Sequence, residues 1–201
     1  PGKHNWQNAA AAYAACRAMG LSREAITAGL MSFPGLAHRC EFVATIEGVR
    51  FVNDSKATNA DATEQALRAF PRVYWIAGGQ AKSDGIAPLT RLFGQVSRAY
   101  LIGEASGKYR AILDAADVSN KECGTLDLAV AAAFADAKSD AEQTGEAVVL
   151  LSPASASFDQ FRDFEHRGDV FRELVLSLAN KSPAKRTPPS GKDEPRLESR
   201  P

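Results

Sequence analysis

The sequence predicts an α/β protein with a Rossmann-like, doubly wound and mostly parallel sheet that has helices on both faces. Short apolar runs alternate with helix-like segments, the order expected when a helix connects each strand to the next. The runs at 73–77, 99–103 and 147–152 are apolar without interruption, as expected for strands covered on both faces. The composition, 45% hydrophobic and 24% charged over 201 residues, is that of a globular protein able to bury one substantial core.

Two helices are predicted ahead of the sheet. Residues 5–19 are rich in Ala and stop at Gly20, a residue type that often follows a helix end. Ser22 can cap a second helix over 22–32, which Pro34-Gly35 would end. The chain begins without Met just before the first helix, and no strand separates the two helices. We therefore expect residues 1–36 to be the end of a larger domain, cut at its start.

Residues 37–180 are predicted to form the sheet domain. Its first two strands, at 41–46 and 49–53, are joined by Glu47-Gly48, which indicates a hairpin. A weaker strand is predicted near 117–122. Helices are predicted at 60–70, 86–94, 104–115, 126–143 and 168–179. Ligands of such sheets bind beyond the carboxyl ends of the strands, so the chemistry is expected in the loops that follow Asn53, Ala77 and Leu151.

The last segment, residues 181–201, differs in composition from the rest of the chain. It holds six Lys/Arg and three Asp/Glu, a net charge of +3, which leaves −3 for residues 1–180 because the whole chain is neutral. It contains almost no apolar residue, so it is predicted to be a disordered basic, Pro-rich tail. A charge of +3 spread over this length is weak support for a nucleic-acid partner, and none is predicted.

Cysteine usage and hydropathy limit the class of protein further. Cys16, Cys40 and Cys123 are scattered, odd in number and without CxxC spacing, so they predict neither a disulfide framework nor a metal site and favour a reducing cytoplasm. No apolar run approaches the roughly 18 residues of a membrane span. The first residues lack the pattern of a signal peptide. A membrane partner is therefore not expected.

Two common nucleotide-binding motifs are missing from the sequence. GEASGKY (103–109) is the nearest approach to a P-loop, but its glycines are one residue too close and Tyr109 stands where a Mg²⁺-binding Ser/Thr would be. There is no GxGxxG, which leaves a dinucleotide-dependent dehydrogenase without its main signal. Gly78-Gly79 by itself indicates only a tight turn.

Four polar stretches are candidates for function, and the first two are weak on their own. In HNWQN (4–8), Asn5 and Asn8 share one face at a helix start. Their amides could read a base edge or a ribose, although Asn at this position also commonly caps a helix. In HRCEF (38–42), Arg39 could hold a phosphate with two hydrogen bonds, or could be an ordinary surface residue.

The other two stretches follow predicted strands and open predicted helices. NDSKATN (53–59) gathers an acid, a lysine and hydroxyl groups at a helix start, a combination that suits a ribose, a phosphate and a carboxylate. Capping would explain one or two of these residues but not all of them. In SPASASFDQF (152–161), the Ser157 hydroxyl and nearby free N–H groups could bind an anion, or Ser157 could simply cap the helix.

Taken in this order, the four stretches resemble the Mur ligase family, the ATP-dependent amino-acid ligases of bacterial cell-wall synthesis. NDSKATN after HRCEF, and LLSPASASFDQF followed by FEHRG, resemble in particular the family members that add D-glutamate. Ser155 departs from them, because they often have Cys there. The resemblance covers about residues 1–180.

The resemblance implies a three-domain parent protein. Residues 1–36 would be the last two helices of its central ATPase domain, and residues 37–180 its whole carboxy-terminal Rossmann-like domain. The cofactors would be ATP and Mg²⁺, and the substrates UDP-N-acetylmuramoyl-L-alanine and D-glutamate. The P-loop and the metal ligands would lie upstream of Pro1, in the missing amino-terminal and central domains of the same polypeptide. No metal ligand is therefore expected in this chain, and the fragment alone is expected to be inactive.

The resemblance also implies roles for individual residues. Asn5, Asn8 and His38 would surround the adenine, and Asp54 would face the ribose. Arg39 would face the ATP phosphates and Lys56 the phosphoryl group that is transferred, which makes these two the catalytic residues. The carboxylates of D-glutamate would be held by Thr58, Lys82, Ser157 and the backbone of Phe158, with Phe164 nearby. The L-alanine carboxylate would become an acyl phosphate, which the amine of D-glutamate then attacks.

Two alternatives remain open on the sequence. The chain could be a catalytically incompetent module that binds a nucleotide or a partner without turnover, because it has no P-loop. It could also be an unrelated Rossmann-like nucleotide-binding or redox domain, although it lacks the glycine fingerprint of that class.

Overall fold

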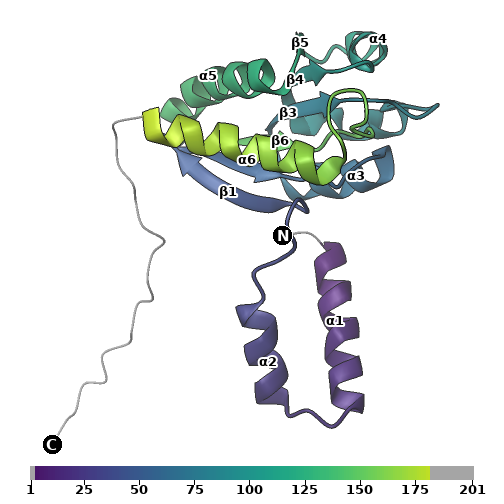
Figure 1. Cartoon of the computed structure of the whole chain (residues 1–201), viewed down its shortest axis with the longest axis vertical. Coiled ribbons are helices and arrows are strands. Elements are labelled where there is room, and N and C mark those ends of the chain that lie inside the picture. The colour runs from purple at the N-terminus through teal and green to yellow at the C-terminus, as the bar shows by residue number, and fades with distance from the viewer. Residues whose placement is uncertain (1–2, 182–201) are drawn as a thin grey trace, which may run out of the picture.

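A computed structural model describes residues 3–181, with the side chains of residues 6–180. A six-stranded sheet lies between two layers of helices, and a helical hairpin precedes it (Figure 1). The elements, in chain order, are α1 (Lys3–Ala18), α2 (Arg23–Ser32), β1 (Glu41–Ile46), β2 (Val49–Asn53), α3 (Ala60–Ala69), β3 (Val73–Gly78), the 3₁₀ helix η1 (Ala87–Gln95), β4 (Val96–Ile102), α4 (Ser106–Ala115), β5 (Asn120–Gly124), α5 (Leu126–Thr144), β6 (Ala147–Leu151) and α6 (Phe164–Lys181).

The sheet has the strand order β1-β2-β6-β3-β4-β5, and only β1 runs antiparallel to its neighbour. The β1–β2 turn at Glu47-Gly48 has positive φ at both residues, 50° and 81°, as a tight hairpin turn requires. Strand β6 lies between β2 and β3, with Leu151 paired to Asn53 on one side and to Ile76 on the other. Three parallel strands therefore end at nearly the same level, which brings their outgoing loops together.

Two apolar layers fill the space between the sheet and its helices. On one face α5 and α6 contribute residues such as Ala133, Phe171 and Val175, and on the other face α3, η1 and α4 contribute Leu67 and Leu113, among others. Strands β3 and β6 are buried along their whole length, as their uninterrupted apolar runs predicted. The predicted fold class, a Rossmann-like α/β sheet, is confirmed.

The neighbouring strands β2 and β6 send their connections to opposite faces of the sheet. The chain leaves β2 into α3, which packs on one face, and leaves β6 into α6, which packs on the other. Such a switch point opens a crevice at the carboxyl ends of the two strands, and ligands of doubly wound sheets bind there. A ligand site is therefore expected at the loops 53–59 and 152–163.

Some element boundaries differ from the predicted ones. The segment predicted as a helix at 86–94 is a 3₁₀ helix, in which the Leu89 N–H bonds to the Ile86 carbonyl three residues earlier. The last helix begins at Phe164 rather than 168, because the Asp163 carboxylate accepts the His166 N–H and caps its first turn. The weak strand predicted near 117–122 lies at 120–124. The predicted tail lies outside the described residues from 182 onward.

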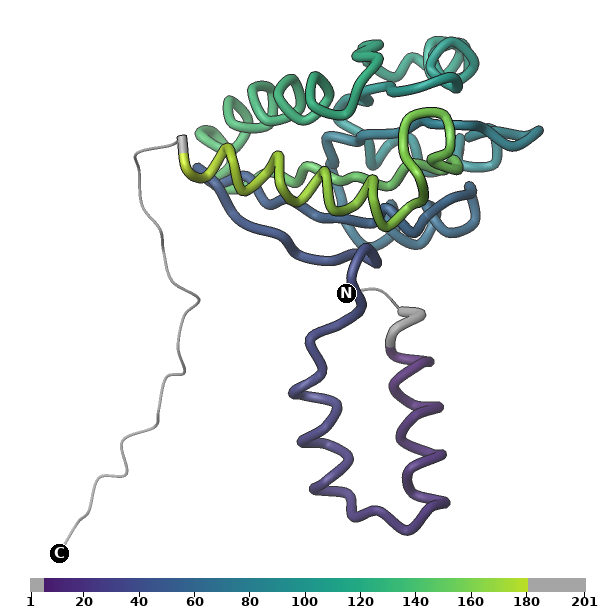
Figure 2. The backbone as a smooth tube through the Cα atoms, viewed as in Figure 1, coloured from purple at the N-terminus to yellow at the C-terminus, as the bar shows by residue number. Residues whose placement is uncertain are grey.

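The helices α1 and α2 form a hairpin that extends away from the sheet domain (Figure 2). The Ser22 hydroxyl accepts the Ala25 N–H and caps α2, as predicted. Among the described side chains of the hairpin, only that of Ile26 is buried. Several large apolar side chains are instead exposed, namely Trp6, Met19, Leu21, Leu30, Met31 and Phe33. Within residues 3–181, none of the helices has both the length and the apolar character that crossing a membrane would require.

Candidate functional site

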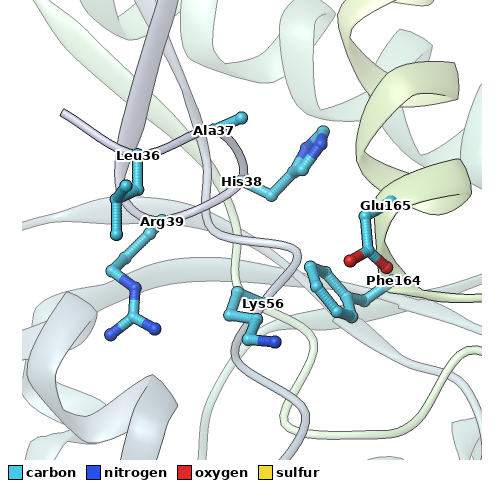
Figure 3. Close-up of a pocket in the computed structure, with 7 residues that line it drawn as sticks. All are labelled: Leu36, Ala37, His38, Arg39, Lys56, Phe164 and Glu165. Carbon is cyan, nitrogen blue, oxygen red and sulfur yellow. The ribbon is translucent and has the colours of Figure 1, made fainter. Parts of the chain in front are cut away.

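A cleft of about 320 Å³ lies beside the switch point of the sheet, between the segment that leads into β1, the loop after β2 and the start of α6. Its lining combines two cationic side chains with one carboxylate and with apolar and aromatic side chains (Figure 3). The lining residues are Leu36, Ala37, His38, Arg39, Lys56, Phe164 and Glu165. Four of the residues predicted to be functional therefore meet in one cleft.

The last residue of β2 and the first two residues of the following loop turn their side chains inward, and the next residue, a lysine, points outward. Asn53, Asp54 and Ser55 are 0%, 5% and 0% exposed, whereas Lys56 is exposed. The Lys56 N–H donates to the His38 carbonyl at 2.9 Å, which fixes the backbone of the loop against the segment before β1. The Lys56 Nζ lies 3.8 Å from the centre of the Phe164 ring, a cation–π contact that holds the ammonium group at the cleft.

Arg39 supplies the second positive charge at the cleft. Its side chain is exposed and extends away from the His38 ring, while Lys56 reaches toward Phe164 (Figure 3). Two exposed cations on one wall are suited to a polyanion such as the phosphates of a nucleotide.

Asp54 is a buried carboxylate that the fold holds on both oxygens. Its Oδ2 accepts the Ser152 hydroxyl at 2.8 Å, and its Oδ1 accepts the Cys40 N–H at 3.1 Å. Burial raises the pKa of Asp54 to about 6, and the hydrogen bonds from Ser152 and Cys40 oppose that rise. The side chain thus connects the loop after β2 with the loop after β6. Its predicted contact with a ribose stays a prediction.

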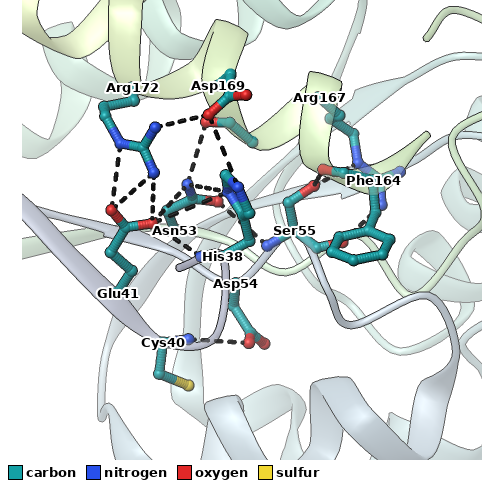
Figure 4. A network of polar contacts seen from close by, with 11 residues as sticks. His38, Cys40, Glu41, Asn53, Asp54, Ser55, Phe164, Arg167, Asp169 and Arg172 are labelled. Carbon is teal, nitrogen blue, oxygen red and sulfur yellow. Dashed lines mark hydrogen bonds and ion pairs between the residues drawn. The ribbon is translucent and has the colours of Figure 1, made fainter. Parts of the chain in front are cut away.

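The His38 ring is turned away from the Arg39 side chain (Figure 3) and toward the polar network of Asn53, Glu41 and Asp169 (Figure 4). Its backbone has a left-handed φ of 60°, and its Nδ1 lies 3.1 Å from Asn53 Nδ2. A Cβ on Gly168 would come within 2.2 Å of that Nδ1, so only glycine leaves room for the ring. His38 is 6% exposed. His38 is among the residues that line the cleft, and its predicted contact with adenine stays a prediction.

An ion-pair network surrounds His38 and joins α6 to β1 (Figure 4). Arg172 donates to both carboxylate oxygens of Glu41, at 2.9 and 3.1 Å, and also pairs with Asp169 at 2.6 Å. Glu41 Oε2 accepts the His38 N–H at 2.8 Å. Asp169 Oδ1 lies 3.7 Å from the far nitrogen of the His38 ring. The network fixes the segment that presents Arg39.

The loop after β6 is packed tightly against the end of β3. Ala156 pairs with Gln80 through two backbone hydrogen bonds, and the Tyr109 hydroxyl contacts Ser155 Oγ at 2.6 Å and the Ala154 carbonyl at 3.0 Å. A Cβ on Gly79 would meet the Ala156 carbonyl at 2.3 Å, so the tight turn expected at Gly78-Gly79 also permits this close approach.

The two residues of this loop that were predicted to bind the second substrate differ in exposure. Ser157 is 2% exposed and its carbonyl accepts the Phe161 N–H at 2.8 Å, whereas Phe158 is 69% exposed. Thr58, in the neighbouring loop after β2, is half-buried. Because β2 and β6 are adjacent, Thr58 and Ser157 emerge from adjacent strands at one edge of the sheet.

The loop that carries Lys82 follows β3 and is exposed. Lys108, in the first turn of α4, donates from its Nζ to the carbonyls of Lys82, at 3.3 Å, and of Ser83. The lysine of the P-loop-like segment therefore binds a protein loop in this fold.

Two of the three predicted adenine residues lie in the helical hairpin, and Asn8 is not among the residues that line the cleft. Asn5 and Asn8 are both in the first half of α1, and the side chain of Asn8 is exposed. The side chain of Asn5 lies outside those that the structure describes. In the part of the chain from 3 to 181, no group of three or more His, Cys, Asp or Glu residues is placed to hold a metal ion.

Several residues of this site were not anticipated from the sequence. The loops are joined by hydrogen bonds of Ser55, Ser152 and the fully buried Arg167. An ion pair between Glu41 and Arg172 holds β1 against α6 next to the cleft. A signal for Arg167 existed, because it lies four and eight residues before Phe171 and Val175 and so falls on the buried stripe of α6. A charged residue on such a stripe indicates a buried polar contact.

Comparison with known proteins adds to this geometry. Residues 38–155 match the family model described as the Mur ligase, glutamate ligase domain. The UDP-N-acetylmuramoylalanine--D-glutamate ligase of Caulobacter sp. (strain K31) is 56% identical over 186 residues, which are 92% of this chain and 39% of that protein. The enzyme of the same name from Rhodospirillum rubrum is 57% identical over 180 residues, 90% of this chain and 37% of its own length. The chain thus spans less than half the length of these relatives.

A solved structure with a similar fold belongs to the UDP-N-acetylmuramate-alanine ligase of Thermotoga maritima. It superimposes with a TM-score of 0.60 over 88% of this chain and 39% of its own, at 16% sequence identity. At that identity, the likeness supports the fold alone.

Proposed function

The chain belongs to the Mur ligase family, and we propose that it is the carboxy-terminal part of an ATP-dependent ligase that adds D-glutamate to UDP-N-acetylmuramoyl-L-alanine in peptidoglycan synthesis. The observation that carries the proposal is the 56–57% identity to D-glutamate ligases over nine-tenths of the chain. The position of Arg39 and Lys56 in one cleft, and of the loops after β2 and β6 on adjacent strands, supports it.

We propose that residues 37–180 are the carboxy-terminal domain of the parent enzyme and residues 1–36 the end of its central ATPase domain. Two properties of the hairpin support this division. It extends away from the sheet, and it exposes large apolar side chains such as Trp6 and Met31, at 79% and 83%, which a neighbouring domain would cover. The three free cysteines are consistent with a cytoplasmic parent.

In the proposed reaction, ATP supplies the phosphoryl group that activates the L-alanine carboxylate of the precursor as an acyl phosphate. Phosphoryl transfer requires positioning and positive charge rather than covalent help, and Arg39 and Lys56 offer both at the cleft. Their exposure and common location fit the phosphates of ATP. In our proposal Mg²⁺ binds to the part of the parent enzyme outside this chain, as the resemblance to the family implies.

The second half of the reaction needs D-glutamate held with its amine free. In our proposal Thr58, Ser157, Lys82 and the Phe158 N–H hold the two carboxylates, with Phe164 beside them. The amine nitrogen attacks the acyl-phosphate carbonyl, the C–O bond to phosphate breaks, and the nitrogen loses a proton. The products are the amide, inorganic phosphate and ADP. Hydroxyl donors and a cation from adjacent strands suit two carboxylates.

A phosphate-release assay on the full-length parent enzyme tests the proposal. Release should require ATP, UDP-N-acetylmuramoyl-L-alanine and D-glutamate together, and it should be lost in Lys56→Ala but kept in Lys121→Ala, an exposed lysine on β5. The 201-residue chain alone should release no phosphate, because its sequence contains no P-loop. Release by the parent that does not depend on D-glutamate would contradict the proposal.

A further inference from the structure

Arg167, on the first turns of α6, is a fully buried cation that lies outside the roles assigned above. It is 0% exposed and is among the largest side chains buried to this degree. None of the ion pairs found between residues 3 and 181 includes it. A buried charge without a paired carboxylate is costly unless hydrogen bonds compensate it.

Hydrogen bonds to two loops compensate the guanidinium, and Figure 4 shows its contact with Ser55. Its Nε donates to the Ser55 hydroxyl and its Nη2 to the Ser55 carbonyl, both at 2.9 Å. Its Nη1 donates to the carbonyls of Ser155, at 3.1 Å, and Ala156, at 3.4 Å. Ser55 belongs to the loop after β2 and the other two residues to the loop after β6. One planar group thus bridges the two loops that emerge at the switch point.

The rest of the local structure serves the same bridge. The Ser55 hydroxyl, which accepts from Arg167, donates to the Phe164 carbonyl at 2.8 Å and so anchors the bridge to the start of α6. Gly79 lets the backbone approach, because a Cβ there would lie 3.2 Å from Arg167 Nη1. Burial lowers the pKa of Arg167 only to about 10, so the group remains charged at neutral pH.

The bridged backbone positions are next to the residues that bind substrate in the proposed function. Ser55 precedes Lys56 and lies three residues before Thr58, while Ala156 precedes Ser157. We propose that Arg167 is a positioning residue that sets the spacing between Thr58 and Ser157, and thereby the width of the D-glutamate pocket. This inference rests on the proposed function for its substrate, but the bridge itself can be tested without it.

The bridge is tested first by amide hydrogen exchange on the full 201-residue chain. In Arg167→Met, the amides of 54–58 and 155–158 should exchange about tenfold faster or more, because both loops lose their shared donor. Val175→Ala is the matched control, since it removes buried packing from the same helix about two turns beyond Arg167. In this control, the same amides should keep the wild-type exchange rate. Equal acceleration in both variants would overturn the bridge.

Arg167→Lys provides a second variant if Arg167→Met does not fold. Lysine keeps the charge but has one nitrogen, which cannot reproduce the fork that spans Ser55 and Ala156. It should therefore fold and still show faster exchange in at least one of the two loops. Wild-type exchange in both loops of Arg167→Lys would show that charge alone suffices and would overturn the proposal.

Kinetics of the full-length parent then test the effect on the pocket. The Michaelis constant for D-glutamate should rise about tenfold to a hundredfold in Arg167→Lys, as expected for a displacement of about 1 Å. The Michaelis constant for ATP should rise clearly less than that for D-glutamate, because only one of the two bridged loops, that of Asp54 and Lys56, also serves ATP in the proposed function. A parallel rise for both substrates would overturn the positioning role. The bridge and the proposed function can fail separately. If the two loops exchange faster in Arg167→Met but the parent enzyme shows no D-glutamate-dependent activity, the bridge is supported and the proposed function is overturned.

Discussion

The two regions of this chain that were predicted to serve the active site are built in different ways. The helical hairpin presents Asn8 on an exposed helix, and among its described side chains only Ile26 is buried. The loops of the sheet domain are held from within by buried polar groups, among them Asp54 and Arg167. The two regions therefore differ in burial: most side chains of the hairpin are exposed, whereas the loops of the sheet domain rest on buried side chains.

The contrast indicates how the site is divided between this chain and its parent. In the sheet domain, two apolar layers and buried hydrogen bonds within residues 37–180 hold the loops, so in our proposal this chain itself preorganises the D-glutamate half of the site. In the hairpin, the exposed apolar side chains lack the burial that stabilises a helix pair. The adenine half of the site, in our proposal, becomes ordered only against the rest of the central domain.

The sharpest test of this contrast is the same substitution in both regions. Phe51→Ala, in β2, removes a fully buried ring that packs against Phe134 and Phe171, and should lower the free energy of unfolding by about 3–5 kcal/mol. Phe33→Ala, just after α2, removes a ring that is 61% exposed and should change it by no more than about 0.5 kcal/mol. Urea denaturation followed by circular dichroism measures both. A large loss in Phe33→Ala would mean that the hairpin is packed in the isolated chain.

A pH experiment tests whether the loops are as deeply buried as described. Because the pKa of Asp54 is raised from 3.8 to about 6, the folded state binds this proton more tightly than the unfolded state does. The stabilisation is complete below about pH 4 and is lost as the pH rises toward about 6. At 1.36 kcal/mol per unit, it amounts to about 3 kcal/mol at most.

Asp54→Asn isolates this contribution. The free energy of unfolding of the wild type, minus that of Asp54→Asn, should fall by up to about 3 kcal/mol between about pH 4 and about pH 8. The matched control is Asp61→Asn, an exposed residue in the first turn of α3, for which the difference should not depend on pH in this way. A flat difference for Asp54→Asn would mean that water reaches this carboxylate.

The smallest effect on D-glutamate binding is expected at the loop of Lys82, because the side chain that bonds to this loop, Lys108, is exposed. Lys108→Met removes two hydrogen bonds to the loop and should raise the Michaelis constant for D-glutamate in the parent enzyme about two- to tenfold. Lys121→Met, an exposed lysine on β5, is the control and should leave it unchanged. An unchanged Michaelis constant in Lys108→Met would show that its hydrogen bonds to the loop do not position Lys82.

Local sequence signals predicted much of the fold and the place of the site. Strands β3 and β6 were predicted to within a residue, because a strand buried on both faces has an uninterrupted apolar sequence. The loop 53–59 was recognised because its polar residues exceed what capping needs. Strand β5, with the sequence NKECG, was placed poorly because an edge strand with polar residues has little apolar pattern.

The orientation of individual side chains could not be predicted from local sequence. The His38 ring points inward because its φ is positive and because Gly168, 130 residues away, leaves space for it. Arg167 is buried because Ser55 and Ala156 converge on it from two different strands. Both depend on contacts between distant segments, which no local pattern encodes.

The central claim, that the loops after β2 and β6 form a D-glutamate pocket, is tested most directly by steady-state kinetics of the full-length parent enzyme carrying Thr58→Ala or Ser157→Ala. In the proposed function each change removes a donor to a carboxylate of D-glutamate, which costs about 1.5–3 kcal/mol. The Michaelis constant for D-glutamate should therefore rise roughly ten- to a hundredfold, while that for ATP changes little. The controls are Thr90→Ala and Ser177→Ala, at exposed positions on η1 and α6, which should match the wild type. Equal rises for both substrates, or no rise for D-glutamate in either variant, would contradict the account.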